Sequence, residues 1–431
     1  MGLFEIFAII VVLSALFSYI NYRYIRLPTT IGLMLIALAM SVGVLVLGCM
    51  GIGVKEMAVE FFERVDFSEV LLHGMLGFLL FTGALHVDIN DLIEQKWIVA
   101  FLAGGGVIIS TLIVGASLWA VFRLLPISLP LIYCFVFGAL ISPTDPIAVI
   151  GILRRVGMPR QLETQITGES LFNDGIGVVA FATLLELTVG AGDVTLGKAT
   201  WLFVKETLGG AIFGFLTGLL TYQMLKRVDN YQVEILLTLA LVMGGYAFAD
   251  AFHISGPIAM VVAGLLIGNH GRAFAMSEMT REHLDTFWEL VDGILNAVLF
   301  VLIGMEVLVL AFTWDYLVAG LLAIPIVLLA RLVSVSAPMG LLRLWHQFGA
   351  NAIKIMTWGG LRGGISIALA LSLPRTPERE IIVAITYAIV VFSILVQGLT
   401  IGALAKRSVN EFCKLSQSAS EEKSTARKNH P

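Results

Sequence analysis

Long apolar stretches separated by short polar connections run along almost the whole chain. A helix that crosses a bilayer needs about 20 mostly apolar residues, and residues 4–20, 31–47 and 98–125 are stretches of this kind. The pattern predicts an all-α integral membrane protein with about 13 transmembrane helices in series. The predicted spans are 4–22, 28–49, 69–87, 97–122, 128–153, 161–189, 201–225, 231–250, 255–269, 287–312, 315–342, 351–373 and 380–405.

The composition excludes a water-soluble fold. Of the 431 residues, 58% are hydrophobic and only 13% are charged, with a mean hydropathy of +0.93, whereas soluble proteins carry roughly 25% charged residues. The net charge of -4 and the lack of a basic stripe give no reason to expect a nucleic-acid partner. Cys49, Cys134 and Cys413 lie too far apart in sequence to indicate a disulfide framework or a metal centre. No cofactor is expected.

Positive charges predict the orientation of the chain, because Lys and Arg favour cytoplasmic loops. They are more numerous in every second connection, which places the N-terminus outside and the C-terminus in the cytoplasm. Residues 1–407 are predicted to form one membrane transporter domain, and the polar residues 408–431 a disordered cytoplasmic tail. The positive residues assigned to the cytoplasmic side are Arg23, Arg26, Lys96, Arg154, Arg155, Arg160, Lys226, Arg227, Arg272, Arg281, Arg343, Lys354, Lys406 and Arg407.

Weak internal similarity occurs at an offset near 220 residues. Residues 26–37 (RLPTTIGLMLIA) resemble residues 253–263 (HISGPIAMVVA), and residues 77–81 resemble residues 297–300. Because the second copy starts seven spans after the first, at span nine instead of span two, and each span reverses the direction of the chain, the copies must point in opposite directions across the membrane. The sequence therefore predicts inverted repeats, at approximately 28–189 and 255–405, an architecture found in transporters that work by alternating access. The alternative is a chance likeness between apolar helices.

The fifth predicted span contains two prolines three residues apart, Pro143 and Pro146. Each removes a backbone donor and clashes with the preceding turn, so the helix is expected to break there. Broken backbone at membrane depth lines a cavity or is buried in protein, and its free carbonyls can bind ions. The Thr144 carbonyl and the Asp145 carboxylate are therefore candidate cation ligands. A proline kink with Asp145 capping the second half-helix is the alternative, and the two roles are compatible.

The sixth predicted span places three oxygen-bearing side chains on one helical face. Ser170 and Asp174 are four residues apart, and Asn173 lies one turn from Ser170. Hydroxyl, amide and carboxylate oxygens are ligands that small hard cations favour. A bound cation disfavours protonation of a carboxylate, and protonation removes the ligand's charge, so competition at Asp174 would couple cation flux to proton flux.

The twelfth predicted span carries four glycines around Arg362 in residues 357–365 (TWGGLRGGI), and glycines permit unwinding or close helix contact. Arg362 keeps its charge, so a buried carboxylate is expected beside it, and Glu169 is the candidate. A buried carboxylate is expected beside Arg331 for the same reason, and Glu306 is the candidate. Both ion pairs are expected to be structural rather than to carry ions.

His86 lies beside Asp88 at the inner end of the third predicted span. The unperturbed pKa of histidine is close to physiological pH, so a role in pH sensing is one reading of this residue. A histidine that simply lies at the membrane interface is the commoner case.

These motifs resemble those of the monovalent cation/proton antiporters of the NhaP and sodium/proton exchanger type. The likeness covers nearly all of the membrane domain and rests on residues 144–146 (TDP), 169–170 (ES), 173–174 (ND) and 358–364 (WGGLRGG). It implies a homodimer of thirteen-span protomers, in which two unwound helices, spans five and twelve, cross next to span six. It also implies sodium ligation by Asp174, Asp145, Ser170 and the Thr144 carbonyl, with Asp174 as the ion and proton carrier.

The resemblance further implies a structural ion pair between Glu169 and Arg362. The Asn-Asp pair at 173–174, in place of two aspartates, marks the electroneutral branch and implies one proton per cation. One departure is the third span, where residues 81–86 (FTGALH) lack the glutamate that some relatives place near the ion. This departure affects the expected ligand number and ion preference.

The expected function is secondary active antiport of Na+, Li+ or K+ against H+ in a bacterial inner membrane, serving pH homeostasis. The alternatives are a proton-coupled transporter of another small solute and a passive cation channel, which would use rings of ligands in a symmetric pore. The chain has no H-E-x-x-H, G-x-S-x-G or nucleotide-binding motif, so no enzymatic activity is expected.

Overall fold

Helices make up the regular secondary structure of the part of the chain that the computed structural model describes. An isolated antiparallel bridge joins Asp145 and Leu361. The expected all-α class is confirmed. The described residues are 3–50, 53, 59–60, 67–124, 128–189, 196–310, 313–343 and 351–408.

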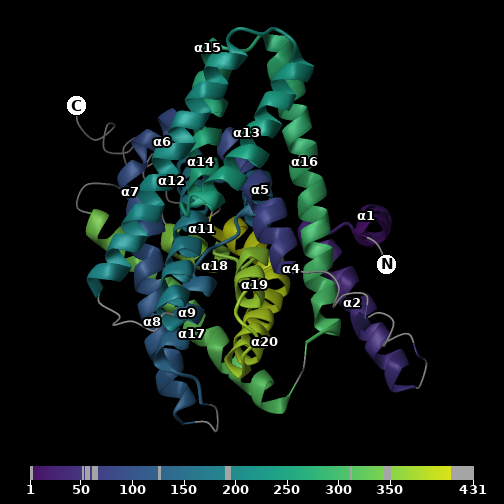
Figure 1. Cartoon of the computed structure of the whole chain (residues 1–431). Helices are drawn as coiled ribbons and strands as arrows, with labels where there is room; N and C mark the ends of the chain where they lie inside the picture. Colours follow the sequence, from purple (N-terminus) through teal and green to yellow (C-terminus); the bar gives the residue numbers. More distant parts are fainter. Residues whose placement is uncertain are drawn as a thin grey trace, which may run out of the picture.

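The helices of the first half pass back and forth through the molecule (Figure 1). Several of them contain a π-helical turn, labelled η here. In chain order they are α1 (Leu3–Ile20), η1 (Asn21–Ile25), α2 (Thr29–Cys49), α4 (Phe67–Glu69), η2 (Val70–Met75), α5 (Leu76–Leu85), α6 (Ile89–Glu94), α7 (Lys96–Ala100), η3 (Phe101–Gly105), α8 (Gly106–Phe122), α9 (Leu131–Ile141), α10 (Ile147–Val156) and α11 (Arg160–Val189).

The second half also consists of helices that cross the molecule, and some of them contain a π-helical turn. Its last span continues beyond η6 as helix to Ser408. The elements are α12 (Leu196–Leu225), α13 (Tyr231–Ala251), α14 (Gly256–Leu266), η4 (Ile267–Gly271), α15 (Arg272–Phe274), α16 (Glu278–Met305), the 3-10 turn η5 (Glu306–Leu308), α17 (Trp314–Leu342), α18 (Ala352–Gly359), α19 (Gly364–Leu371), α20 (Pro377–Phe392) and η6 (Ser393–Gln397).

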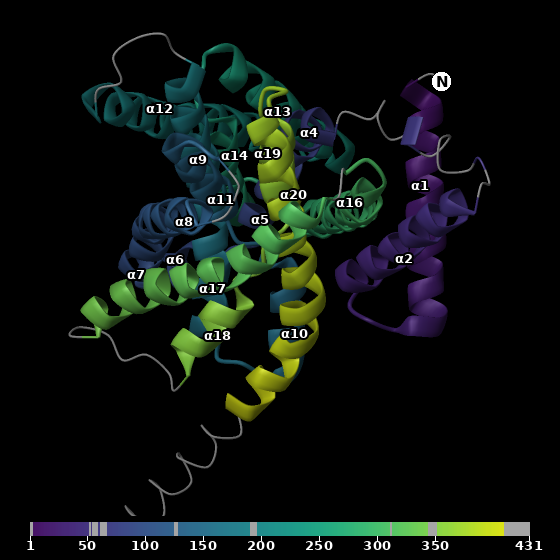
Figure 2. The same cartoon turned by 90° about the horizontal axis from the view of Figure 1, so that it is seen from below.

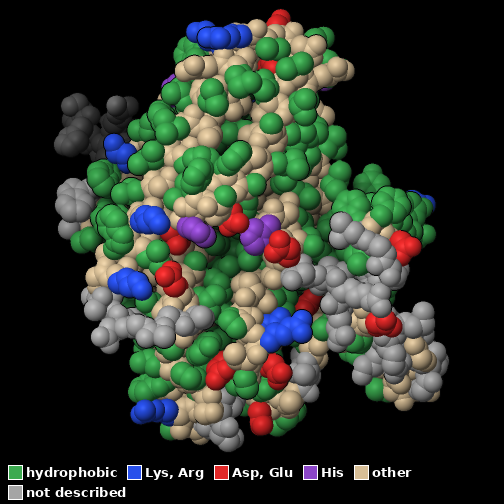
Figure 3. All heavy atoms as spheres, in the orientation of Figure 1, with side chains coloured by type: hydrophobic (Ala, Val, Ile, Leu, Met, Phe, Trp, Pro, Cys, Tyr) green, Lys and Arg blue, Asp and Glu red, His purple; other side chains and the backbone are tan. Residues whose placement is uncertain are grey.

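Ten of the described helices are long and apolar enough to cross a membrane. The other three predicted spans, 128–153, 255–269 and 351–373, coincide with helices that are shorter or interrupted. The total of thirteen spans therefore stays a prediction. Hydrophobic side chains are spread over the face shown in Figure 3, whereas charged side chains and histidines gather around a hollow near its middle and at its ends.

Side-chain caps fix where several helices begin. The Ser255 hydroxyl accepts a hydrogen bond from Ile258 N at the start of α14, and Pro257 lies in its first turn. Ser277 and Thr313 cap α16 and α17 in the same way. Each cap satisfies a backbone donor that the helix itself leaves free, which matters most in a medium without water.

Two groups of helices can be distinguished by their packing. The scaffold bundle comprises α1, α2, α5, α13, α14 and α16, in which α2 packs on α16 and α5 packs on α14. The site bundle comprises α8, α9, α10, α11, α17, α18, α19 and α20, in which α8 packs on α9 and α17, and α17 packs on α20. Helix α12 contacts α11, α13 and α14 and so touches both bundles.

Helix α1 lies at one side of the molecule, where it packs on α2 and α16 (Figure 2). Large apolar side chains such as Phe4 and Phe7 are exposed on it. Helix α12 exposes Trp201, Leu208 and Ile212 in the same way. Both helices therefore present apolar surface that suits a lipid environment.

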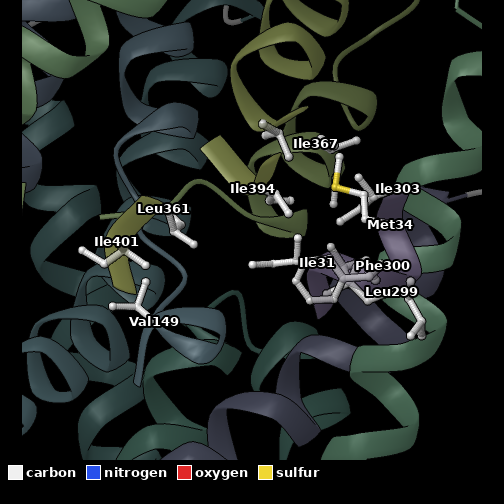
Figure 4. Close-up of a cluster of buried hydrophobic side chains, with 14 of the residues drawn as sticks. Ile31, Met34, Val149, Leu299, Phe300, Ile303, Leu361, Ile367, Ile394 and Ile401 are labelled. Atoms are coloured by element: carbon white, nitrogen blue, oxygen red, sulfur yellow. The ribbon is translucent and has the colours of Figure 1, made fainter. Parts of the chain in front are cut away.

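A buried apolar cluster joins the two bundles (Figure 4). It brings Ile31 of α2 and Phe300 of α16 together with Ile367 of α19. Leu361, in the break between α18 and α19, points toward Val149 of α10. Apolar packing thus surrounds the two helix breaks and keeps their polar backbone inside the protein.

Candidate ion-binding site

The two interrupted helices meet at their breaks. Residues 142–146 separate α9 from α10, and residues 360–363 separate α18 from α19. Asp145 N donates a hydrogen bond to Leu361 O at 2.8 Å, which links the two breaks directly. The break in span five lies where the two prolines were expected to cause it. Both breaks expose backbone groups that a continuous helix would satisfy internally.

Arg362 satisfies part of that exposed backbone. It is only 2% exposed, and its Nη1 donates to Ser142 O at 2.5 Å and to Pro143 O at 2.9 Å. Its backbone N donates to Ser393 Oγ at 2.9 Å. The guanidinium of one broken helix therefore binds the free carbonyls of the other.

The predicted ion pair between Glu169 and Arg362 is wrong. Glu169, 1% exposed, instead accepts a bidentate pair of hydrogen bonds from Arg331 of α17. The Arg331 Nη2 to Glu169 Oε2 distance is 2.9 Å, and Nη2 also donates to Met356 O at 3.1 Å. The reason lies in the broken helix, because its free carbonyls supply Arg362 with strong acceptors and leave Glu169 to Arg331.

The predicted pair between Arg331 and Glu306 is also wrong. Glu306 follows directly on the C-terminal end of α16, whereas Arg331 lies seventeen residues into α17, which begins at Trp314. At 1.5 Å per residue, that is about 25 Å along the helix. The charged group that acts most on Glu306 is Arg379 at the start of α20. Glu306 and Arg331 belong to consecutive spans, but they lie at different depths along the membrane normal.

Asn173 holds the break in place. Its Oδ1 accepts a hydrogen bond from Thr144 N at 3.3 Å, and its Nδ2 donates to Thr144 Oγ1 at 2.8 Å. Thr144 Oγ1 lies 3.0 Å from Ser170 Oγ, and either hydroxyl can donate. Asn173 thus positions Thr144 through both of its amide atoms. Its Oδ1 keeps a second lone pair, so the ligand role predicted for Asn173 stays a prediction.

The Thr144 carbonyl differs from its two neighbours in the break. Arg362 occupies the carbonyls of Ser142 and Pro143, whereas the Thr144 carbonyl accepts no hydrogen bond from the described part of the chain. This oxygen remains available as the sequence predicted.

The position of Asp145 is compatible with both of the roles weighed from the sequence, and its role as a cation ligand stays a prediction. Its Oδ1 accepts a hydrogen bond from Ile147 N at 2.9 Å, which caps α10. The residue also lines a cavity. Gly363 permits this position, because a Cβ at that residue would lie 2.6 Å from Asp145 Oδ2. A Cβ at Gly360 would collide with the Arg331 guanidinium. Gly360 and Gly363 are thus both explained by the close approach of a charged side chain.

Between the two bundles lies a cavity of about 430 Å³. Asp145, Ser170 and Asp174 line it from the site bundle, and Thr82 and Asp292 line it from the scaffold bundle. Asp174 is 8% exposed, and its carboxylate makes no hydrogen bond to the described residues. Of the predicted ligand side chains, the structure brings Asp145, Ser170 and Asp174 to one wall of the cavity, with Thr144 and Asn173 directly behind them.

Sequence reasoning missed five polar residues of this cavity, which are Thr82 on α5, Thr167 on α11, Glu289 and Asp292 on α16, and Ser366 on α19. The spacing of Glu289, Asp292 and Asn296 along α16 is an amphipathic signal that could have indicated Glu289 and Asp292. Single hydroxyl residues in apolar spans carry no comparable signal.

The fold and the site define the class. A membrane protein in which two discontinuous helices meet beside a helix with an intramembrane carboxylate has the architecture of a secondary transporter. Residues 11–407 match the family described as "Sodium/hydrogen exchanger, transmembrane". The chain belongs to this family.

Named relatives resemble the chain over nearly its full length. It is 50% identical over 408 residues to the Na(+)/H(+) antiporter NhaP of Pseudomonas aeruginosa, covering 94% of this chain and 96% of the relative. It is 36% identical to the Na(+)/H(+) antiporter NhaH of Halobacillus aidingensis, covering 89% and 93%. The solved structure of the sodium proton antiporter MjNhaP1 from Methanocaldococcus jannaschii shares the fold, with a TM-score of 0.74, 20% identity and coverage of 94% and 99%.

Proposed function

We propose that this protein is a secondary active antiporter that exchanges Na+, with Li+ or K+ as other candidate cations, for H+ by competition at Asp174. The observation that carries the proposal is the Asp174 carboxylate, which faces the cavity without a hydrogen-bond partner among the described residues, next to two helix breaks. The relatives named as Na(+)/H(+) antiporters support the choice of sodium.

The ligands proposed for the cation are the Asp174 and Asp145 carboxylates, the Ser170 hydroxyl and the Thr144 carbonyl. All are hard oxygen ligands of the kind that an alkali cation prefers. A cation between the two carboxylates offsets their mutual repulsion, whereas a proton on Asp174 removes one of the two charges. Either occupant makes the site less repulsive, and each excludes the other.

The same geometry favours one proton per cation. Asp145 is held as a cap by Ile147 N, and a hydrogen bond donated to a carboxylate favours its charged form. Asp174 has no such restraint among the described residues. Asp145 is therefore proposed to stay charged as a ligand, while Asp174 alone carries the proton, so that the exchange moves no net charge.

Alternating access is proposed to arise from two inverted repeats, at about 28–189 and 255–405. Arg26 and His253, which are matched in the internal similarity, both adopt a positive φ, of 60° and 52°. Each precedes the start of its helix, α2 or α14, by three residues. The pairing of α2 with α16 and of α14 with α5 is the exchange of partners that two-fold related repeats would make.

The proposal extends to the surroundings of the protein, which is multi-pass in a lipid bilayer. A bacterial inner membrane, a cytoplasmic C-terminus, a homodimer and a role in pH homeostasis follow from the charge pattern and the family resemblance. The disordered tail predicted at 408–431 lies, except for Ser408, outside the described residues.

The test is proton movement in proteoliposomes that contain a pH-sensitive dye. Sodium, lithium and potassium are added in turn to the wild type and to Asp174→Asn, with and without a clamped membrane potential. We expect a cation-dependent dye response in the wild type, its loss in Asp174→Asn, and no effect of the potential. A wild type that moves no protons in response to any of the three cations between about pH 5 and 9 would overturn the antiporter proposal.

A further inference from the structure

The span that contains α20 and η6 packs against the break between α18 and α19. It continues beyond η6 as helix to Ser408. A Cβ at Gly359, the last residue of α18, would lie 3.6 Å from Ile401 Cδ1. Ile401 and Leu361 both belong to the apolar cluster drawn in Figure 4. Side chains of this span are therefore close enough to reach the backbone of the break.

Ser393 and Gln397, the first and last residues of η6, contact that backbone. Both are buried, with exposed fractions of 0% and 3%. The Ser393 hydroxyl accepts a hydrogen bond from Arg362 N at 2.9 Å and donates one to Gln397 Oε1 at 2.8 Å. Gln397 Nε2 in turn donates to Trp358 O at 3.0 Å. These two side chains are called the Ser393–Gln397 bridge below.

The two ends of the bridge are a pair of groups that a continuous helix would join. In an α-helix each N–H donates to the carbonyl four residues earlier, so Arg362 N would donate to Trp358 O. The break separates these two groups, and a buried backbone group without a partner is costly inside a membrane protein. The bridge lies between them and satisfies both. It therefore replaces the helical hydrogen bond that the break removes.

The segment held by the bridge also contacts the other break. Leu361 lies within this segment, and its carbonyl accepts the hydrogen bond from Asp145 N at 2.8 Å. Arg362, at the end of the segment, donates from Nη1 to Pro143 O at 2.9 Å. Pro143 and Asp145 are the two neighbours of Thr144 in the chain. The bridged segment therefore holds the backbone on both sides of the Thr144 carbonyl.

We propose that Ser393 and Gln397 are positioning residues for the cation site. By holding Asp145 and the Thr144 carbonyl in place, they set the affinity for the cation and the discrimination among Na+, Li+ and K+. The inference rests on the proposed function and adds to it two residues that lie behind the ligands. A binding site must hold its groups to within about 0.5 Å. Asp174 lies on α11, outside the bridge, so loss of the bridge should weaken cation binding more than it slows maximal exchange.

The first experiment measures proton flux in proteoliposomes at one pH as the concentration of sodium, lithium or potassium is varied. We expect Ser393→Ala and Gln397→Met each to raise the KM for sodium about three- to tenfold and to bring the three KM values closer together. The maximal rate should stay within about a factor of two. The double variant should act no more strongly than either single change, because each one already interrupts the bridge.

Thr386→Val is the matched control. It removes a buried hydroxyl of α20 whose hydrogen bond goes to Ile382 O of the same helix at 2.7 Å, and it should leave all three KM values unchanged. A lower maximal rate with unchanged KM values in Ser393→Ala and Gln397→Met would overturn the proposal, since the bridge would then only stabilise the fold. Effects that multiply in the double variant would also overturn it, because the two side chains would then act separately.

The second experiment measures backbone hydrogen exchange in the purified protein and does not depend on transport. Ser393→Ala removes the acceptor of Arg362 N, so exchange should become faster at residues 357–365 and, through the hydrogen bond between the two breaks, at residues 142–147. Thr386→Val should change neither segment. Unchanged exchange at 142–147 in Ser393→Ala would overturn the link between the bridge and the ligands. If the wild type moves no protons, the antiport proposal fails while hydrogen exchange still tests the bridge.

Discussion

At the scale of single residues, the site depends on how buried charges find partners. Glu169 and Arg331 neutralise one another, while Arg362 binds backbone carbonyls. The two arginines therefore have different roles. Arg331 links α17 to α11, and Arg362 stabilises the break in span five. Asp174 is left without such a partner in the described chain, which suits a residue that changes its occupant.

Removing one member of the Glu169–Arg331 pair should destabilise the protein strongly. Glu169→Gln or Arg331→Gln leaves an uncompensated buried charge, which costs about 3–5 kcal/mol. The double variant, Glu169→Gln with Arg331→Gln, should lose less than the sum of the two single changes. Thermal unfolding in detergent, followed by tryptophan fluorescence, checks this. Additive losses in the double variant would show that the two side chains are not coupled.

Competition at Asp174 predicts how sodium affinity depends on pH. Below the pKa of the competing carboxylate, each unit of pH decrease raises the proton concentration tenfold, so the apparent KM for sodium should rise up to about tenfold per unit. At higher pH the KM should become constant. Initial rates in proteoliposomes at several pH values measure this. A KM that does not change from pH 6 to 9 while the maximal rate falls would speak against direct competition.

At the scale of elements, the site is formed where two helices are interrupted. Glycines at the interruption of the second helix leave room for side chains from other helices. Gly363 lies against Asp145, and Gly360 lies against the Arg331 guanidinium. The site thus depends on backbone shape as much as on its charged side chains.

Gly363→Ala should therefore impair transport without unfolding the protein. The added methyl group would lie 2.6 Å from Asp145 Oδ2, so the carboxylate or the break must shift. Misplacing a reacting group by about 1 Å can cost 100-fold in rate, and a loss of at least tenfold in sodium-dependent proton flux is expected. Gly340→Ala in α17 is the control, since a Cβ there meets no atom within 4 Å. Equal flux in the two variants would contradict the expectation.

At the scale of the whole molecule, the cavity lies where the two bundles face each other. A Cβ at Gly83 of α5 would lie 3.6 Å from Leu171 Cδ1 of α11, so the scaffold and site bundles touch beside the cavity. Movement of one bundle against the other would open and close the path to Asp174.

Cross-linking tests this movement. With the native cysteines replaced, a disulfide between Gly83→Cys and Leu171→Cys should stop exchange, and a reductant should restore it. The controls are the two single-cysteine variants, Gly83→Cys and Leu171→Cys, under the same oxidising conditions. Each should leave exchange intact, because neither alone can link the two bundles. Full exchange by the oxidised Gly83 and Leu171 variant would exclude relative movement at this contact.

The sequence by itself determined the class of the fold and most of one wall of the site. Membrane helices depend on local composition, because each must satisfy its own backbone in lipid. The break at 142–146 depends on two prolines, and the alignment of Ser170 with Asp174 depends on the helical repeat. These features need no knowledge of distant contacts, and the structure bears out all three.

Only the tertiary structure decided which charge meets which. The Glu169–Arg331 pair and the carbonyls bound by Arg362 depend on the relative depth of helices far apart in sequence. The opposite wall of the cavity, with Thr82 and Asp292, depends on how α5 and α16 face the site bundle. Packing between helices sets how deep each residue lies and which helix its face contacts. The residues of a single helix indicate almost nothing about either.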